Sequence, residues 1–249
     1  MRIRIFSTPA AAARGLAAEV AGAIAAHPRL VLGLATGRTP VLFYRQLVAR
    51  CRAVDLDCSG ITTFNLDEFL GVGADDRRSY RLFMERHLFD HVGVSSRRVH
   101  FLNGRAREVE AECRRYERAI RRAGGIDLQI LGLGANGHIG FNEPGASLIA
   151  RTHRVRLRPA TRRANAAIFD GRATTVPREA LSMGMATILH ARRIVLLAIG
   201  AAKARSVAQV VEGPLTTRVP ASLLQLHGNA DIWLDRAAAG ALNRLPATP

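Results

Sequence analysis

The 249 residues carry 36 Lys and Arg against 20 Asp and Glu, a formal net charge of +16, and 48% of them are hydrophobic. This apolar fraction excludes a largely disordered chain, and glycine and proline without a period exclude a collagen-like one. No stretch approaches the roughly 20 apolar residues of a membrane span. The three cysteines show no metal-ligand spacing and the N-terminus lacks an apolar leader. We therefore expect a reduced, cytoplasmic protein without a metal site.

Short apolar, β-branched runs alternate with stretches of helical period along the chain. In the first half of the chain we predict strands at 2–6, 30–34 and 61–65 and helices at 9–26, from about 40, at 79–89 and at 107–123. In the second half we predict strands at 128–133, 194–199 and 231–234, a helix from about 202 and a terminal helix after the last strand. Residues 144–170 are less regular, and we expect a loop-rich insertion over the sheet edge. The alternation predicts a single α/β domain over residues 1–249 with a largely parallel sheet.

Lysine is nearly absent, since Lys203 is the only one and the other 35 basic residues are arginine. A nucleic-acid-binding surface usually contains both lysine and arginine, because attraction to phosphate needs positive charge of either kind. The near absence of lysine therefore indicates a coding bias over the whole chain rather than such a surface. In a chain that has lost its other lysines, we expect Lys203 to be needed as lysine.

Ligands of open parallel sheets bind beyond the carboxyl ends of the strands. Three segments directly follow predicted strands, namely 35–40, 65–69 and 132–144. They should converge on one site, which the helix after residue 199 should also approach.

The first of these segments contains the loop Thr36, Gly37, Arg38 and Thr39 ahead of a helix. Glycine lets the backbone approach a ligand, hydroxyls donate hydrogen bonds, and a helix N-terminus offers free N–H groups to an anion. A phosphate site and an ordinary strand-to-helix turn are equally compatible with this loop alone.

Residues 132–137 match G-x-G-x-x-G after a predicted strand. However, no smooth amphipathic helix follows, and no acidic residue lies at 152–157, where a ribose-binding carboxylate would be expected. We therefore expect no dinucleotide cofactor.

Titratable side chains in the second and third segments point to acid/base chemistry. His138 lies in a glycine-flanked turn, and Glu143 could hold one tautomer of its imidazole. Asp67 and Glu68 add paired carboxylates, which could also be an acidic pair at a helix N-terminus. Together with a phosphate-type loop, these residues favour a site for acid/base chemistry on a sugar phosphate.

The sequence resembles the glucosamine-6-phosphate deaminase (isomerising) family of the glucosamine/galactosamine-6-phosphate isomerase superfamily. The resemblance rests on ordered blocks over nearly the whole chain: LGLATGRTP (32–40), FNLDEFLGV (64–72), SYRLFMERHLFDHV (79–92), AECRRYERAI (111–120), GLGANGHIGFNEPGASL (132–148), TRRAN (161–165), VPREALSMGMATIL (176–189) and VEG with LLQLH (211–227). GHIGFNEP and FNLDEF are specific, whereas TGxTP is shared with 6-phosphogluconolactonase-like relatives.

The resemblance implies a Rossmann-like open sheet with helices on both faces. It implies conversion of glucosamine 6-phosphate to fructose 6-phosphate and ammonia, by an enzyme classed as a hydrolase, without metal or organic cofactor. His138 matches the residue that opens the pyranose ring, and Asp67 matches the base that moves a proton from C2 to C1. Glu143 matches the residue that orients the histidine, together with Asn136, where aspartate is common.

The resemblance also implies a phosphate site made by Thr36, Gly37, Arg38, Thr39 and Lys203. The arginine that usually follows the TRxAN block is Ala167 here, and Arg38 replaces a small residue of TGxTP. We hypothesise that Arg38 restores the charge lost at Ala167.

Some members of the resembled family bind an acetylated sugar phosphate at an activator site between subunits. The serine and basic ligands of that site are replaced here by Ala146, His153 and Val155. We therefore expect no allosteric activator, and the resemblance allows a homo-oligomer.

Three alternatives stay open beside the deaminase. The first is an enzyme for another amino sugar phosphate, such as galactosamine 6-phosphate; a lactonase fits the FNEP block less well. The second is a sensor that binds sugar phosphate without turnover. The third, which we do not favour, is nucleic-acid binding by an acid-free basic run: Arg151, Arg154, Arg156, Arg158, Arg162 and Arg163.

Overall fold

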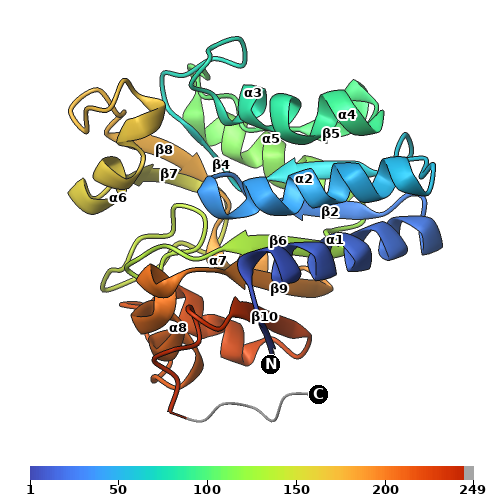
Figure 1. The fold of residues 1–249 in the computed structure, drawn as a ribbon. Coiled ribbons are helices and arrows are strands. Elements are labelled where there is room, and N and C mark those ends of the chain that lie inside the picture. Colours follow the sequence, from blue (N-terminus) through green and yellow to red (C-terminus); the bar gives the residue numbers. More distant parts are fainter. Residues whose placement is uncertain (244–249) are drawn as a thin grey trace.

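The main sheet of the computed structural model, which describes residues 1–243, has seven strands that all run parallel (Figure 1). The strands lie in the order β1 (Arg2–Phe6), β10 (Ala230–Asp235), β9 (Arg193–Ala198), β6 (Leu128–Gly132), β2 (Val31–Leu34), β3 (Thr62–Asn65) and β5 (Val99–His100). Crossover connections place helices on both faces of such a sheet. The predicted α/β fold is confirmed.

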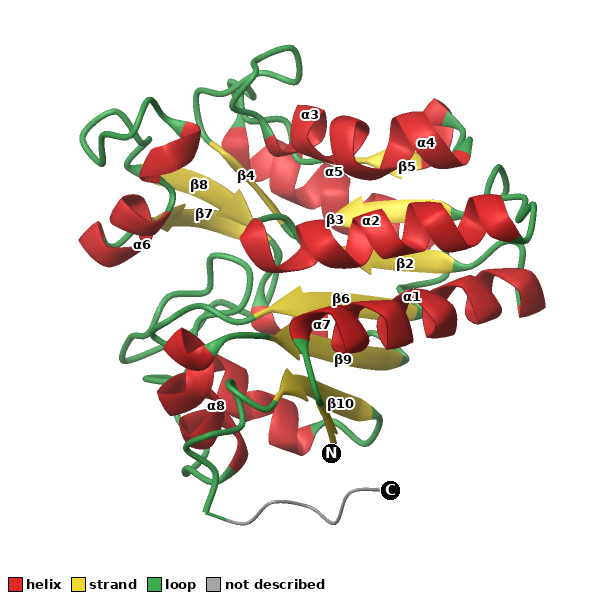
Figure 2. Ribbon diagram, viewed as in Figure 1, coloured by secondary structure: helices red, strands yellow, loops and turns green. Residues whose placement is uncertain are grey.

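Alternate side chains of each strand enter opposite cores. In β9, Ile194 and Leu196 pack into one core, and Val195 and Leu197 into the other. The second core is covered by α1 (Pro9–Ala26) and α2 (Arg38–Ala53), in front of the sheet in Figure 2. Period-2 alternation in the strands thus buries both faces, as a doubly covered sheet requires.

The opposite core is covered by helices from later in the chain. They are α5 (Val109–Arg122), α7 (Met185–Leu189), α8 (Ala204–Val211) and the 3-10 helix η5 (Pro220–Leu226). The 3-10 helix η4 (Ala201–Lys203) joins β9 to α8. This order carries the chain from the carboxyl end of β9 directly into a helix.

A second, antiparallel sheet has three strands in the order β4 (Asp67–Phe69), β8 (Glu179–Ser182) and β7 (His153–Arg156). Its own small core contains Phe69, Tyr80, Phe141 and Phe169. Short elements complete the fold: α3 (Tyr80–Met84), the π-helix η1 (Glu85–Phe89), α4 (Asp90–Val92), η2 (Ser96–Arg98), α6 (Pro159–Ala164) and η3 (Ala166–Ile168). This small sheet stands at the carboxyl edge of the main sheet (Figure 1).

Three sequence predictions need correction. The helix predicted at 79–89 is α3 followed by π-helical η1. Residues 144–170 contain β7 and α6, so they are more regular than expected. Residues 236–241 form turns instead of the predicted terminal helix, and residues 244–249 lie outside the described part.

Within residues 1–243, no helix combines the length and the apolar character needed to cross a lipid bilayer.

Candidate active site

The carboxyl ends of the parallel strands gather at one edge of the main sheet, on the left in Figure 1. The loops after β2, β3 and β6 and the helix η4 after β9 all start at this edge. The segments 35–40, 65–69 and 132–144 are therefore neighbours, as the sequence predicted.

Lys203 interacts electrostatically with two of these segments, through Arg38 and through His138. Burial lowers the pKa of Lys203, and the positive charge of Arg38 lowers it further. Lys203 in turn contributes to lowering the pKa of His138. Lys203 of η4 thus lies near the imidazole and also near Arg38 at the start of α2, and the two cations together would attract a dianion.

His138 is held by a chain of two polar side chains. Asn136 Nδ2 donates to Glu143 Oε2 at 3.1 Å, which fixes the amide with its oxygen toward the imidazole. His138 Nδ1 lies 2.7 Å from Asn136 Oδ1, an acceptor only, so Nδ1 carries the proton. Glu143 Oε2 is 3.9 Å from Nδ1, too far for a direct hydrogen bond. The arrangement leaves His138 Nε2 as a free base.

Burial lowers the pKa of His138, although the charge of Glu143 raises it. The uncharged Asn136 amide adds no charge to offset burial, so the imidazole is neutral near pH 7. A neutral imidazole with Nδ1–H and a bare Nε2 can take a proton from a sugar hydroxyl.

The glycines of this loop are needed for its shape. A Cβ at Gly134 would lie 2.3 Å from the His138 ring, so only glycine allows the ring to pack there. Gly137 has φ of +83°, a conformation that L side chains rarely adopt. Gly134 N donates to His138 O at 2.9 Å, which closes the turn. The G-x-G-x-x-G pattern thus positions a histidine rather than a dinucleotide.

Asp67 is the buried carboxylate of the site. Its residue is 6% exposed, and no donor within residues 1–243 hydrogen-bonds its carboxylate. Burial raises the pKa of Asp67 to about 7. A Cβ at Gly140 would lie 3.6 Å from Asp67 Oδ2, so the carboxylate packs against the turn that carries His138. A carboxylate with a pKa near the working pH is suited to removing a carbon-bound proton.

Glu68 has a different role from its neighbour. Its carboxylate accepts the backbone N–H groups of Phe69, Tyr80 and Arg81 at 2.9–3.3 Å. It therefore caps the start of α3. The side chains of Asp67 and Glu68 lie on opposite faces of β4, because successive side chains of a strand alternate between its faces.

Tyr80 was not singled out from the sequence. Its hydroxyl donates to Asn165 Oδ1 at 3.1 Å and also hydrogen-bonds the Thr36 side chain. Its pKa is raised well above the usual value, first by burial and then by the charges of Asp67 and Glu68. Tyr80 therefore joins the loop after β2 to the region of α6 and η3. No signal in the sequence pointed to this contact, because an aromatic residue in a predicted helix is usually part of the hydrophobic core.

The loop after β2 has the backbone of an anion site. Gly37 has φ of +105°, and a Cβ there would meet no atom within 4 Å. Gly37 precedes α2, whose first turn carries Arg38 and Thr39. The first N–H groups of a helix lack intrahelical acceptors and favour negative charge. Arg38 is exposed, and no acceptor within residues 1–243 binds its guanidinium.

Ala167 lies in η3, two residues after Asn165, and is exposed. Since Asn165 reaches the Thr36 loop through Tyr80, position 167 is near the phosphate-type loop but supplies no charge. Arg38 and Lys203 are the cations in the described residues that the structure brings to this loop.

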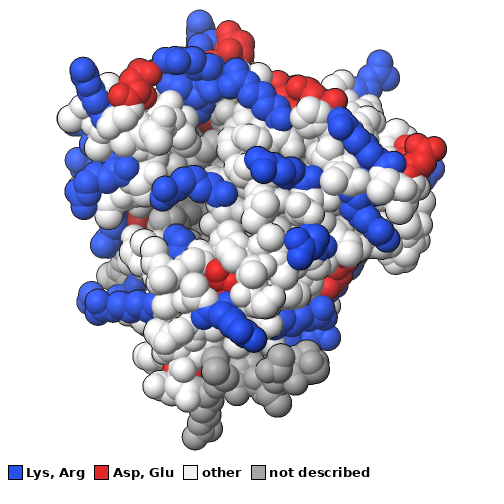
Figure 3. Space-filling model, viewed as in Figure 1, with Lys and Arg blue, Asp and Glu red and all other residues white. Residues whose placement is uncertain are grey.

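The basic run of residues 151–163 is largely engaged within the protein. Arg154 pairs with Glu179, Arg151 lies 3.6 Å from Glu117, and Arg162 donates to two backbone carbonyls. Figure 3 shows Lys and Arg spread over the whole viewed face rather than gathered in one patch. This geometry disfavours nucleic-acid binding by the run.

Among residues 1–243, no three His, Cys, Asp or Glu side chains are grouped so that they could hold a metal ion.

Comparisons with known proteins match the chain over nearly its whole length. It is 48% identical over 239 residues to the glucosamine-6-phosphate deaminase of Alkaliphilus metalliredigens, covering 96% of this chain and 98% of the relative. It is 47% identical over 242 residues to that of Halothermothrix orenii, with 97% and 100% coverage.

A solved structure described as a monomeric glucosamine-6-phosphate deaminase superposes with a TM-score of 0.93 at 43% identity, covering 97% of this chain and all of the other. The 6-phosphogluconolactonase of Trypanosoma cruzi shares the fold with a TM-score of 0.78 at 19% identity, covering 98% of this chain and 97% of the other. The family model for glucosamine-6-phosphate isomerases/6-phosphogluconolactonase matches residues 7–233. The chain belongs to this family.

Proposed function

We propose that the protein is a glucosamine-6-phosphate deaminase that converts glucosamine 6-phosphate and water to fructose 6-phosphate and ammonia. The observation that carries the proposal is the series of hydrogen bonds from Glu143 through Asn136 to His138, which lies beside the buried Asp67. The sequence that holds these residues is up to 48% identical to named deaminases. The small sheet and the loops at the carboxyl edge bring these groups together.

Ring opening uses His138. Its bare Nε2 accepts the proton of the anomeric hydroxyl and returns it to the ring oxygen, which frees the aldehyde. Asn136 holds the ring in this tautomer, and Glu143 holds Asn136.

Proton transfer between carbons uses Asp67. The open aldehyde acidifies the proton at C2, Asp67 removes it, and the protonated Asp67 then delivers a proton to C1 of the resulting enolamine. The imine left at C2 is hydrolysed to the ketone with release of ammonia. Burial keeps Asp67 strongly basic for a carboxylate, since its pKa is raised to about 7.

The phosphate binds at the start of α2. Thr36 and Thr39 donate hydroxyl hydrogen bonds, Gly37 allows close backbone approach, and Arg38 and Lys203 supply positive charge. Binding the phosphate there directs the other end of the sugar toward Asp67 and His138.

The expectation of a hydrolase needs correction. The branch of the family that this chain resembles is described as glucosamine-6-phosphate isomerases, and the central step moves hydrogen between two carbons before the nitrogen leaves. One domain over residues 1–249, a cytoplasmic location, a place in N-acetylglucosamine catabolism and the lack of an allosteric activator stay predictions.

The test is ammonia release by the purified protein from glucosamine 6-phosphate, with galactosamine 6-phosphate and the N-acetylated sugar phosphate as comparison substrates. We expect ammonia and fructose 6-phosphate in equal amounts from the first substrate. In heavy water, the product should carry deuterium at C1. Binding of glucosamine 6-phosphate without ammonia release would refute the proposal and indicate a sensor.

A further inference from the structure

A cavity lies at the amino edge of the main sheet, opposite the edge that carries the site. Leu30 precedes β2, Leu128 begins β6 and Arg193 begins β9, and all three line this cavity. Its volume is about 720 Å³. Small-molecule sites commonly enclose roughly 300–1,000 Å³. Because the strands are parallel, nothing bound here can touch Asp67 or His138.

The apolar side of the cavity is formed by the last turn of α1 and the start of β6. Ala23 and Ala26 face it from the helix, Leu30 faces it from just before β2, and Leu128 faces it from the start of β6. A predominantly apolar wall with a few polar groups is typical of a site for a small organic molecule.

The charged side of the cavity is basic. Arg29, Arg192 and Arg193 line it, against one carboxylate, Asp127, which is already paired with Arg192. Within residues 1–243, Arg29 makes no ion pair. Among the three lining arginines, Arg29 is therefore the one whose positive charge no carboxylate of the described residues pairs with.

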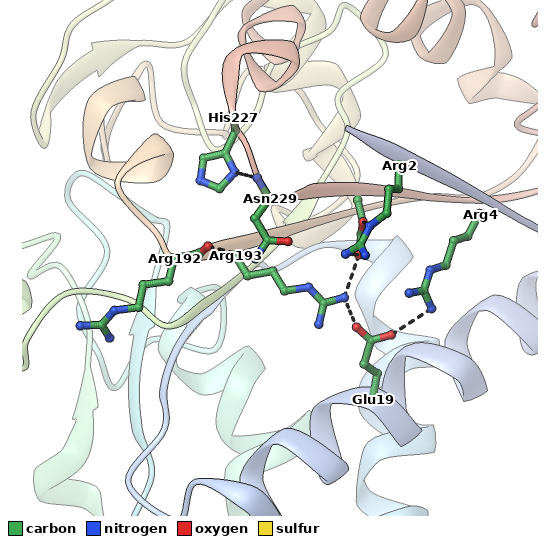
Figure 4. Close-up of polar contacts among 8 residues, drawn as sticks. Arg2, Arg4, Glu19, Arg192, Arg193, His227 and Asn229 are labelled. Atoms are coloured by element: carbon green, nitrogen blue, oxygen red, sulfur yellow. Dashed lines mark hydrogen bonds and ion pairs between the residues drawn. The ribbon is translucent and has the colours of Figure 1, made fainter.

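Arg193 is held in place by its neighbours (Figure 4). Its Nη2 donates to Glu19 and, at 2.7 Å, to Asp231, and these carboxylates are also paired with Arg4 and Arg2. The other terminal nitrogen, Nη1, has no acceptor within the described residues and carries no dashed line in Figure 4. The guanidinium is thus fixed by one nitrogen and can donate with another, which lowers the entropic cost of binding an anion.

We propose that this cavity is a second binding site, for a small organic anion with an apolar body. The body packs on Ala26 and Leu128, and the oxyanion accepts from Arg193 and Arg29. Apolar burial and charge-assisted hydrogen bonds supply the affinity.

The probe for this site is 1-anilinonaphthalene-8-sulfonate, an aromatic anion whose fluorescence rises on binding. We expect one saturable site per chain that glucosamine 6-phosphate at saturation does not displace. Ala26→Trp fills the cavity and should weaken binding at least about tenfold. Ala25→Trp is the matched control, because Ala25 is exposed on the same turn and does not line the cavity, and it should change affinity less than about twofold.

The anionic part is tested with Arg29→Gln, which should weaken binding about three- to tenfold, whereas Arg14→Gln on the exposed side of α1 should not. Both tryptophan variants should retain deaminase activity, which shows that they fold. Equal affinity in Ala26→Trp and Ala25→Trp would overturn the proposal. Displacement of the probe by glucosamine 6-phosphate, or equal affinity in the two glutamine variants, would overturn it as well.

Discussion

Replacing Asp67 by asparagine should abolish turnover and at the same time stabilise the folded protein. The carboxylate is 6% exposed, and no donor in residues 1–243 hydrogen-bonds it, so ionising it in the fold is costly. Burial raises its pKa from 3.8 to about 7. At 1.36 kcal/mol for each pKa unit, the ionised group lowers the free energy of unfolding by about 4 kcal/mol. Asparagine fits the same space but neither ionises nor acts as a base.

The sign follows from the order of the two pKa values. Because the folded-state pKa lies above the unfolded-state value, wild-type stability is fully present below pH 3.8 and is lost as the pH rises through about 7. The advantage of Asp67→Asn over wild type should therefore grow by about 4 kcal/mol between pH 4 and pH 8. Activity should be lost at every pH.

Urea unfolding measures this difference, and Trp233 is a suitable fluorescent reporter because it is buried and is the only tryptophan. Asp231→Asn is the control of opposite sign. Burial raises the pKa of Asp231, but hydrogen bonds from Arg2 and Arg193 outweigh it and hold the pKa below 3.8. Its substitution should destabilise by about 3–5 kcal/mol at pH 8, and less as the pH falls below 4. A pH-independent effect of Asp67→Asn would refute the reasoning.

Three further predictions concern the site. Arg38→Gln should raise KM roughly ten- to hundredfold with little change in kcat, and adding Ala167→Arg should recover part of the loss; steady-state kinetics check this, and an unchanged KM would contradict charge compensation. Asn136→Asp should raise the pKa of His138, because it adds a negative charge beside Nδ1; an NMR titration of the imidazole checks it, and a lower pKa would be inconsistent with this contact. His138→Gln should impair the ring-closed sugar more than an open-chain analogue, and equal losses in rate would show that His138 does not serve ring opening.

Much of the main sheet could be predicted from local patterns. Alternation along β9 divides its side chains between two cores, and helical period covers α1, so these elements follow from spacing alone. Loops that follow parallel strands share one edge, which is why the neighbourhood of the Thr36 loop and His138 was also predictable. The π-helical turn η1 could not be predicted, because it differs from an α-helix only in hydrogen bonds that span five residues instead of four.

The features that could not be predicted depend on contacts between residues that are far apart in the sequence. β4 has three residues and exists because it pairs with β8, more than 100 residues later; this pairing buries Asp67 and turns Glu68 to the start of α3. No window of sequence around Asp67 contains the groups that desolvate it, so its raised pKa could not be predicted. The acid-free appearance of the basic run was misleading for the same reason, since the carboxylates of Glu117 and Glu179 reach it through space. Sequence alone predicted which residues carry the chemistry, whereas burial and long-range pairing decided the pKa values and the partners of those residues.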